Sequence, residues 1–159
     1  WDRRLDARLG QALLSIPSAK EVELGDALAA SRAPGRAAHD VIVRKDDTLA
    51  RAGNRAGGLE GGVTNGEVLV ARVALKPIAT LRRPLPSVDL DSGREVEGRY
   101  VRSDVAVVPA AAVITEALAA LVLGDAWLEK FGGDSLADIG AALALYRARL
   151  PRWPEEPGP

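Results

Sequence analysis

The sequence predicts a single α+β domain in which an antiparallel sheet packs on helices. Strand-like and helix-like apolar patterns are mixed along the chain without regular strand–helix–strand alternation. The chain has 159 residues, and 47% of them are apolar, which is enough for one domain with a packed core. The sequence contains no internal repeat and no obvious linker. We therefore expect residues 1–150 to fold as one unit, followed by a flexible proline-rich tail over 151–159.

The first predicted element is an amphipathic helix from Asp2 to about Ser15, which Pro17 ends. Its evidence is the helical spacing of Leu5, Leu9, Leu13 and Leu14. Further toward the glycine-rich region we expect a strand over 22–24, a helix from 25–26 to 31, a loop over 33–36, a strand over 41–43 and a polar, poorly periodic stretch over 45–53.

The clearest strand is Val68–Leu75, which is nearly continuous in apolar character. Residues 81–87 are expected to form an extended connector, and Asp91-Ser92-Gly93 is a turn signal. A buried core helix is expected from Pro109 to about Leu123, with Gly124 interrupting it before a helical continuation to Phe131. The last predicted helix begins at a cap on Asp134 or Ser135 and runs to about Leu150.

Composition excludes several classes of function. The net charge of −1 gives no indication of nucleic acid as a partner. The absence of cysteine and the presence of one histidine, His39, argue against a thiolate or histidine-rich metal site. Glu116 lies within the longest apolar run, so a buried helix is a better interpretation than a membrane span. We therefore expect no metal, nucleic acid or membrane partner.

The segment from Asn54 to Glu67 contains five glycines among fourteen residues. Its spacing matches neither a Walker loop nor a dinucleotide-binding fingerprint. Alone it indicates either a surface hairpin or a backbone that approaches a ligand closely.

Two short polar segments follow the glycine-rich region. Residues Lys76 to Thr80 end the best strand with an amine and a hydroxyl, and Arg102 precedes Asp104 by two residues. Taken alone, Lys76 is best interpreted as a solvent-exposed lysine at the end of a strand. Arg102 and Asp104 form either a surface ion pair or a positioned base with its charge partner.

The order and separation of these segments are more specific than any one of them. From Asp2 to about Tyr146 the chain resembles the C-terminal half of chorismate synthases. The resemblance is carried by the following blocks: 5–8, 15–16, Lys20 with 22–26, 38–40, 54–67, 76–80, 102–104, 108–110 and 129–134. It implies one half of the family's β-α-β sandwich, in which helices lie between two antiparallel sheets.

The resemblance also implies an activity. Enzymes of this family are carbon–oxygen lyases that convert 5-enolpyruvylshikimate-3-phosphate to chorismate by 1,4-elimination of phosphate, using reduced FMN. The step belongs to the shikimate pathway of aromatic amino acid biosynthesis. NADPH, a cytoplasmic location and a homotetrameric assembly are further expectations.

Site residues carried over from the family are expectations of the same kind. The FMN contacts implied are Pro17, Ser18, Gly61, Lys76, Pro77, Ile78, Ala79, Thr80 and Arg102. Asp104 matches an aspartate near the flavin that handles a proton. The sequence departs from the family at Pro17-Ser18, where many members have Asn-Ala, and at Glu21 and Ala27, where glycine is usual.

The chain begins at Trp1 and contains no methionine, so we expect a fragment whose N-terminal half is missing. In the family that half carries two catalytic histidines and most substrate-binding arginines, and His39 matches neither histidine. The fragment alone is therefore expected to be inactive. Two alternatives remain open: a non-catalytic flavin-binding, phosphate-binding or oligomerisation module with the same fold, and an unrelated nucleotide-binding domain.

Overall fold

A computed structural model of the chain describes residues 1–45, 48–102 and 105–150. The predicted tail over 151–159 lies outside the described residues. In chain order the elements are α1 (Leu5–Leu14), β1 (Ala19–Leu24), α2 (Ala27–Ser31), α3 (Gly35–Ala38), β2 (Ile42–Lys45), β3 (Thr48–Arg51), β4 (Leu59–Glu60), β5 (Val63–Thr64), β6 (Ala71–Leu75), β7 (Pro86–Val88), β8 (Glu95–Glu97), α4 (Val108–Phe131) and α5 (Leu136–Ala148). Mixed helices and antiparallel strands confirm the α+β class.

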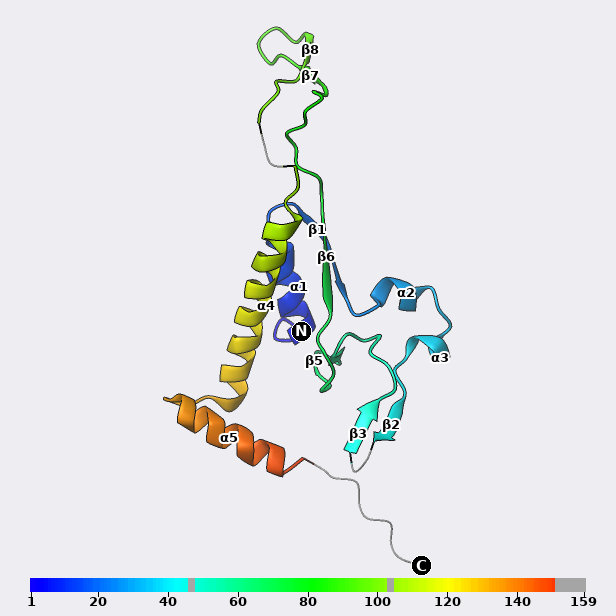
Figure 1. Ribbon diagram of the computed structural model, residues 1–159, viewed down its shortest axis with the longest axis vertical. Helices are drawn as coiled ribbons and strands as arrows, with labels where there is room; N and C mark the ends of the chain where they lie inside the picture. The colour runs from blue at the N-terminus through cyan, green and yellow to red at the C-terminus, as the bar shows by residue number, and fades with distance from the viewer. Residues whose placement is uncertain (46–47, 103–104, 151–159) are drawn as a thin grey trace, which may run out of the picture.

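The centre of the molecule is a two-stranded antiparallel ribbon of β1 and β6 that packs with helices α1 and α4 (Figure 1). Leu5, Leu9 and Leu13 are buried on one face of α1, as their spacing predicts. Leu5 and Leu9 form the core with Leu59, and apolar residues of α4 cover this cluster: Ala119, Val122, Leu123 and Ala126.

The expectation of a buried helix over the longest apolar run is wrong for this chain. α4 is one continuous helix of 24 residues, and Ala111 is its only buried residue. Among the described residues α1 packs along it and α5 contacts it, and the other residues of α4 are partly or fully exposed to solvent. By length and mean hydropathy it could cross a membrane, and 6% of its apolar window is buried.

Gly124 does not interrupt α4, contrary to the sequence-based expectation. A β-carbon added at this glycine would meet nothing within 4 Å, so the residue lies on an open face of the helix. The final helix, α5, agrees with the prediction at its start. The Ser135 side chain accepts a hydrogen bond of 3.2 Å from the backbone N–H of Asp138, which makes Ser135 the N-cap.

The described strands form four separate two-stranded ribbons, whereas the sequence suggested one sheet. The stretch expected to be poorly periodic contains β3, which pairs with β2. The expected loop over 33–36 overlaps the single-turn helix α3. The expected connector over 81–87 includes the start of β7, which pairs with β8. These elements are exposed on most of their residues, so they leave little apolar periodicity in the sequence.

Candidate functional site

The turn after α1 and the end of β6 lie side by side. The backbone N–H of Lys76 donates a 2.9 Å hydrogen bond to the carbonyl oxygen of Ser18, directly beyond the last rung of the ribbon, Ala19–Leu75. Among the described residues, Ser18 is the only one other than glycine with a positive φ, at 74°. The structure therefore brings the predicted Pro17-Ser18 pair next to the predicted run that begins at Lys76.

Arg102 lies in the segment between the hairpin that leaves this end of the ribbon and helix α4. After Thr80 the chain leaves in a long hairpin and returns at residues 101–102, shortly before α4 begins (Figure 1). Leu75, at the end of β6, and Val108, at the start of α4, line the same cavity. Lys76 and Arg102 are exposed, and in the part of the chain that the structure describes neither forms an ion pair. Asp104, the predicted proton-handling residue, lies outside the described residues.

Gly61 is placed elsewhere. Gly61 and Gly62 form the two-residue turn of the β4–β5 hairpin, with φ of +60° and +87°, as a type I′ turn requires. The Gly62 carbonyl accepts a 2.8 Å hydrogen bond from the N–H of Leu5, at the opposite end of α1 from Ser18. The described chain therefore does not bring Gly61 to Ser18 and Lys76. They are separated by about the length of the five-residue strand β6, roughly 17 Å.

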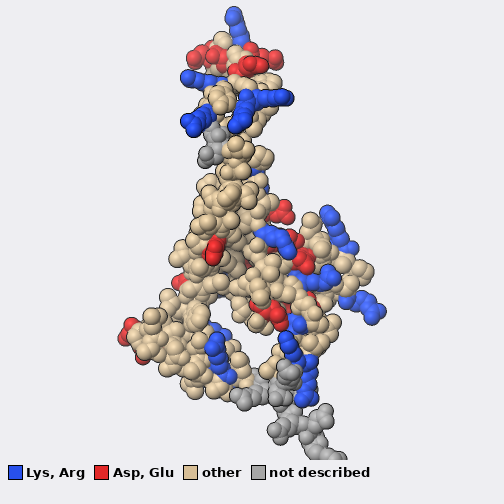
Figure 2. Space-filling model, viewed as in Figure 1, with Lys and Arg blue, Asp and Glu red and all other residues tan. Residues whose placement is uncertain are grey.

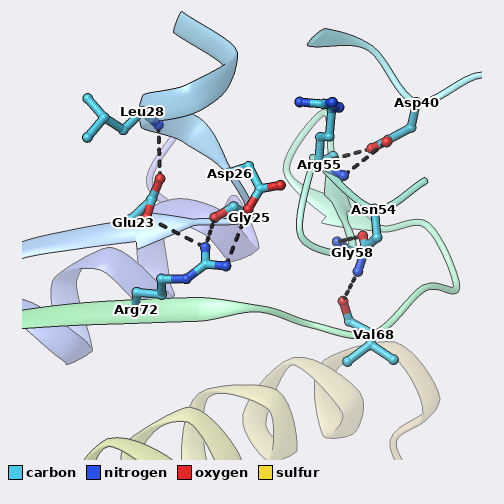
Figure 3. Close-up of polar contacts among 11 residues, drawn as sticks. Glu23, Gly25, Asp26, Leu28, Asp40, Asn54, Arg55, Gly58, Val68 and Arg72 are labelled. Atoms are coloured by element: carbon cyan, nitrogen blue, oxygen red, sulfur yellow. Dashed lines mark hydrogen bonds and ion pairs between the residues drawn. The ribbon is translucent and has the colours of Figure 1, made fainter. Parts of the chain in front are cut away.

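The glycine-rich segment is held in place mainly by contacts inside the chain (Figure 3). Gly25 and Gly57 touch backbone to backbone, since a β-carbon on Gly57 would lie 2.3 Å from the Gly25 nitrogen. Asn54 bridges the segment, accepting a 2.7 Å hydrogen bond from the Gly58 N–H and donating a 2.8 Å bond to the Val68 carbonyl. These contacts explain Gly57 and Gly58 without a ligand.

A charged cluster fixes the turn that faces this segment. The Arg72 guanidinium on β6 lies 3.5 Å from a Glu23 carboxylate oxygen and 3.3 Å from one of Asp26, and it also donates to the Gly25 carbonyl (Figure 3). Glu23 in turn accepts a 2.9 Å hydrogen bond from the N–H of Leu28 in α2. The cluster therefore links the ribbon to the Gly25 turn against which the glycine-rich segment packs.

Asp40 anchors the segment from the other side. Its two carboxylate oxygens accept 2.9 Å hydrogen bonds from the N–H groups of Arg55 and Ala56. Burial opposes the charge, yet the N–H groups of Ala56 and Arg55, with the positive charges of Arg55 and Arg51, hold the pKa of Asp40 below its ordinary value. Asp40 therefore holds the backbone of a loop that lies 15 and 16 residues further along the chain.

This lowered pKa predicts a pH-dependent stability. A carboxyl group whose pKa is lower in the folded state contributes stability above its unfolded pKa of about 3.9, and that contribution disappears as pH falls through the folded value. We expect Asp40→Asn to destabilise the chain by about 1–2 kcal/mol at pH 7, with the difference shrinking below about pH 4. Urea unfolding followed by circular dichroism between pH 3 and pH 7 measures it.

Asp134→Asn is the control, because Asp134 is exposed and has no hydrogen bond or ion pair within the described residues. A constant difference between Asp40→Asn and the unsubstituted chain at every pH would contradict the assignment of this carboxylate as a charged anchor.

An apolar cavity of about 410 Å³ lies between strand β6 and the helices α1 and α4. Its lining comes from three elements and the segment before β6: Leu9 and Leu13 from α1, Leu69 before β6, Ala71, Val73 and Leu75 from β6, and Val108, Ala111, Ala112, Thr115, Glu116, Ala119 and Leu123 from α4. Glu116 is the only charged residue in this lining. Its side chain is exposed, and it forms no ion pair with any described residue. The cavity walls are otherwise too apolar to bind a phosphorylated ligand.

The fold and these residues define an α+β protein in which a ribbon backed by α1 and α4 carries at one end an exposed lysine, Lys76, that has no ion-pair partner among the described residues. The profile of the chorismate synthase family matches residues 1–128. The chain belongs to the chorismate synthase family, which rules out an unrelated nucleotide-binding domain.

Individual relatives agree with this assignment. The chain is 54% identical over 143 residues to the chorismate synthase of Corynebacterium diphtheriae, covering 90% of this chain and 36% of that protein. It is 55% identical over 151 residues to the enzyme of Moorella thermoacetica, covering 94% and 39%. A crystal structure of a chorismate synthase superimposes with a TM-score of 0.74 at 39% identity, over 92% of this chain and 37% of that one. The chain thus spans less than two fifths of the length of these relatives.

Proposed function

We propose that this chain is the C-terminal part of a chorismate synthase, a lyase that eliminates phosphate from 5-enolpyruvylshikimate-3-phosphate to give chorismate. The observation that supports the proposal is the hydrogen bond that joins Ser18 to the start of the Lys76–Thr80 run at one end of the ribbon, in a member of this family. The remainder of the enzyme, a homotetrameric assembly and a cytoplasmic location belong to the same proposal.

The residues at this end of the ribbon fit a phosphorylated cofactor such as reduced FMN. Lys76 and Arg102 are exposed cations without ion-pair partners among the described residues, and a phosphate favours charge-assisted hydrogen bonds from such groups. The left-handed backbone of Ser18 fixes the turn beside them. When bound there, reduced FMN, kept reduced by NADPH, would supply the electron density that helps the phosphate to leave.

The chain's own residues have separate tasks in this proposal. Lys76 and Arg102 bind and orient anionic groups of cofactor or substrate, which carries a phosphate and two carboxylates. Pro77, Ile78, Ala79 and Thr80 shape the backbone that lies against the flavin. Asp104 holds the proton that leaves the substrate. Gly61, which the described chain keeps apart from these residues, belongs to the proposed cofactor contacts by resemblance alone.

Arg102 provides the test of the cofactor site. In the protein expressed from its complete reading frame, Arg102→Ala should weaken FMN binding about 10- to 100-fold, because one charge-assisted contact to an anion is worth about 1.5–3 kcal/mol. Titration of FMN followed by flavin fluorescence measures the dissociation constant.

Arg94→Ala is the matched control, since Arg94 is an exposed arginine at the far tip of the hairpin that separates Thr80 from Arg102. Equal dissociation constants for Arg102→Ala, Arg94→Ala and the unsubstituted protein would overturn the proposed role of Arg102.

A non-catalytic binding or oligomerisation module with the same fold is the alternative to the lyase. The two candidates differ in the coding sequence upstream of Trp1. An upstream segment with histidines and clustered arginines supports the lyase, whereas a start codon at the boundary supports the module.

A further inference from the structure

The hairpin formed by residues 81–101, here called the arm, is a defined structure at its tip. Between β7 and β8 the N–H of Asp89 donates a 2.9 Å hydrogen bond to the Arg94 carbonyl, and the Asp89 carboxylate accepts 2.7 Å bonds from the N–H and hydroxyl of Ser92. Gly93 completes the turn with a φ of 67°. Nearer the body, the Gly98 N–H donates a 2.9 Å bond to the Leu85 carbonyl.

Nothing in the described chain covers the arm. It projects from the end of the ribbon, clear of the helices and of the other strands (Figure 1). Its apolar side chains meet solvent, with exposed fractions of 97% for Leu90, 63% for Leu85 and 54% for Tyr100. An isolated two-stranded hairpin is only marginally stable in water, so an arm of this length indicates a partner surface.

The charges of the arm are segregated along its length. Asp89, Asp91 and Glu95 lie toward the tip, and Arg82, Arg83 and Arg99 lie toward the base. Figure 2 shows the acidic side chains gathered above a basic zone, with one further basic group at the extreme tip, where Arg94 lies in the turn. None of these six residues has an ion-pair partner in the described ranges.

The acidic and basic groups of one arm are too far apart to neutralise each other. Arg83 and Asp89 are six residues apart, about 20 Å in extended chain, which exceeds the Debye length of about 8 Å at physiological ionic strength.

The acidic group at the tip and the basic group at the base lie on opposite sides of one rung of the hairpin, at equal distances along the chain. Pro86 pairs with Glu97. On one leg Arg83 precedes Pro86 by three residues and Asp89 follows it by three, and on the other leg Glu95 precedes Glu97 by two and Arg99 follows it by two. A two-fold axis that passes beside this rung, perpendicular to the strands, therefore brings the acidic tip of each arm to the basic base of the other on both legs. Such self-complementarity is what a symmetric interface between two copies requires.

We propose that the arm is a dimerisation element that lies antiparallel against the arm of a second copy of this chain. Asp89, Asp91 and Glu95 of each arm meet Arg82, Arg83 and Arg99 of the other, and the exposed apolar side chains of the two arms cover one another. The proposal specifies an interface within the proposed homo-oligomer, on which it rests, and it is independent of the flavin chemistry.

The test uses two charge-reversal variants of the protein expressed from its complete reading frame. The tip variant carries Asp91→Lys and Glu95→Lys, and the base variant carries Arg83→Glu and Arg99→Glu. Asp89 is left intact because it holds the turn. In the tip variant both ends of the arm are positive, and in the base variant both are negative, so each variant opposes its own self-association. A mixture of the two restores opposite charges at both contacts.

Sedimentation velocity is expected to show that each variant alone loses one association step, with its dissociation constant raised at least about 10-fold. The equimolar mixture is expected to recover a constant within about 3-fold of the original. The control variant, Arg32→Glu with Arg36→Glu, makes the same charge change as the base variant on exposed residues around α2 and α3 and should associate normally.

Three outcomes would overturn the arm interface. A monomeric unsubstituted protein would overturn it together with the proposed homo-oligomer. An oligomer that tolerates both variants would overturn the arm interface alone. Two variants that each dissociate alone and still fail to associate when mixed would also overturn it. Complementary charges would restore association in the mixture, whereas loss of folding would not.

Discussion

Gly57→Ala is expected to unfold most of the chain, whereas Gly61→Ala, at nearly the same φ, is expected to cost only the conformational penalty of about 1–2 kcal/mol. Both glycines have left-handed backbone, with φ of +62° and +60°, so both substitutions carry the same conformational penalty of about 1–2 kcal/mol. The positions differ in the space around them. A β-carbon on Gly57 would lie 2.3 Å and 2.5 Å from backbone atoms of Gly25, whereas one on Gly61 would meet nothing within 4 Å.

Backbone atoms cannot rotate away as a flexible side chain does, so the Gly57 contact has to be relieved by separating the glycine-rich segment from the Gly25 turn. We expect a total destabilisation above about 4 kcal/mol, which is most of the stability of a marginal domain. Thermal and urea unfolding by circular dichroism compare the two variants, and the matched φ isolates the steric term. Similar midpoints for Gly57→Ala and Gly61→Ala would show that backbone packing at Gly25 does not hold the segment.

The second expected result is that the chain as given releases no phosphate from 5-enolpyruvylshikimate-3-phosphate when reduced FMN is supplied. It covers 36–39% of the length of its relatives, and most of the surface of α4 has no cover. The cations at the end of the ribbon face solvent, where their interaction with an anion is weakened by water. Phosphate release under anaerobic conditions is therefore expected to equal the rate without protein.

Activity is expected to appear when the chain is joined to the part of the Moorella thermoacetica relative that this chain does not match. The same fusion carrying Gly57→Ala is the negative control, because it tests whether folding of this chain is required. Turnover by the chain alone would refute the proposal that catalysis needs the rest of the enzyme, and a folded but inactive fusion would favour the non-catalytic module.

The longer helices α1, α4 and α5 were predictable because each has a local signal in the sequence, whereas the single-turn helix α3 was expected to be a loop. The spacing of Leu5, Leu9 and Leu13 predicted α1, and Ser135 predicted the start of α5. Gly124 was misjudged as an interruption, since one glycine on an open helix face costs only about 1 kcal/mol and does not end a helix. The strands β3 and β8 lacked any signal, because no buried face imposes alternation on them.

The candidate site was predictable only in part. Resemblance identified Ser18, Lys76 and Arg102, and the pairing of Ala19 with Leu75 explains why Ser18 and Lys76 meet. The structural anchors were missed, because Asp40 reaches Arg55 and Ala56 across 15 and 16 residues, and no local pattern indicates such a contact. Gly61 was predicted at the same site, and the described fold gives it a turn position at the other end of α1.

The exposure of α4 has a practical consequence for anyone who purifies this chain. A 24-residue helix that contains an apolar 18-residue window, with a mean hydropathy of 1.7 and 6% of the window buried, offers detergent micelles a large apolar surface. Detergent added to keep the chain in solution would therefore compete for the helix with any protein partner. Association measured in detergent would be underestimated, so reconstitution is best attempted after the detergent is removed, or by co-expression.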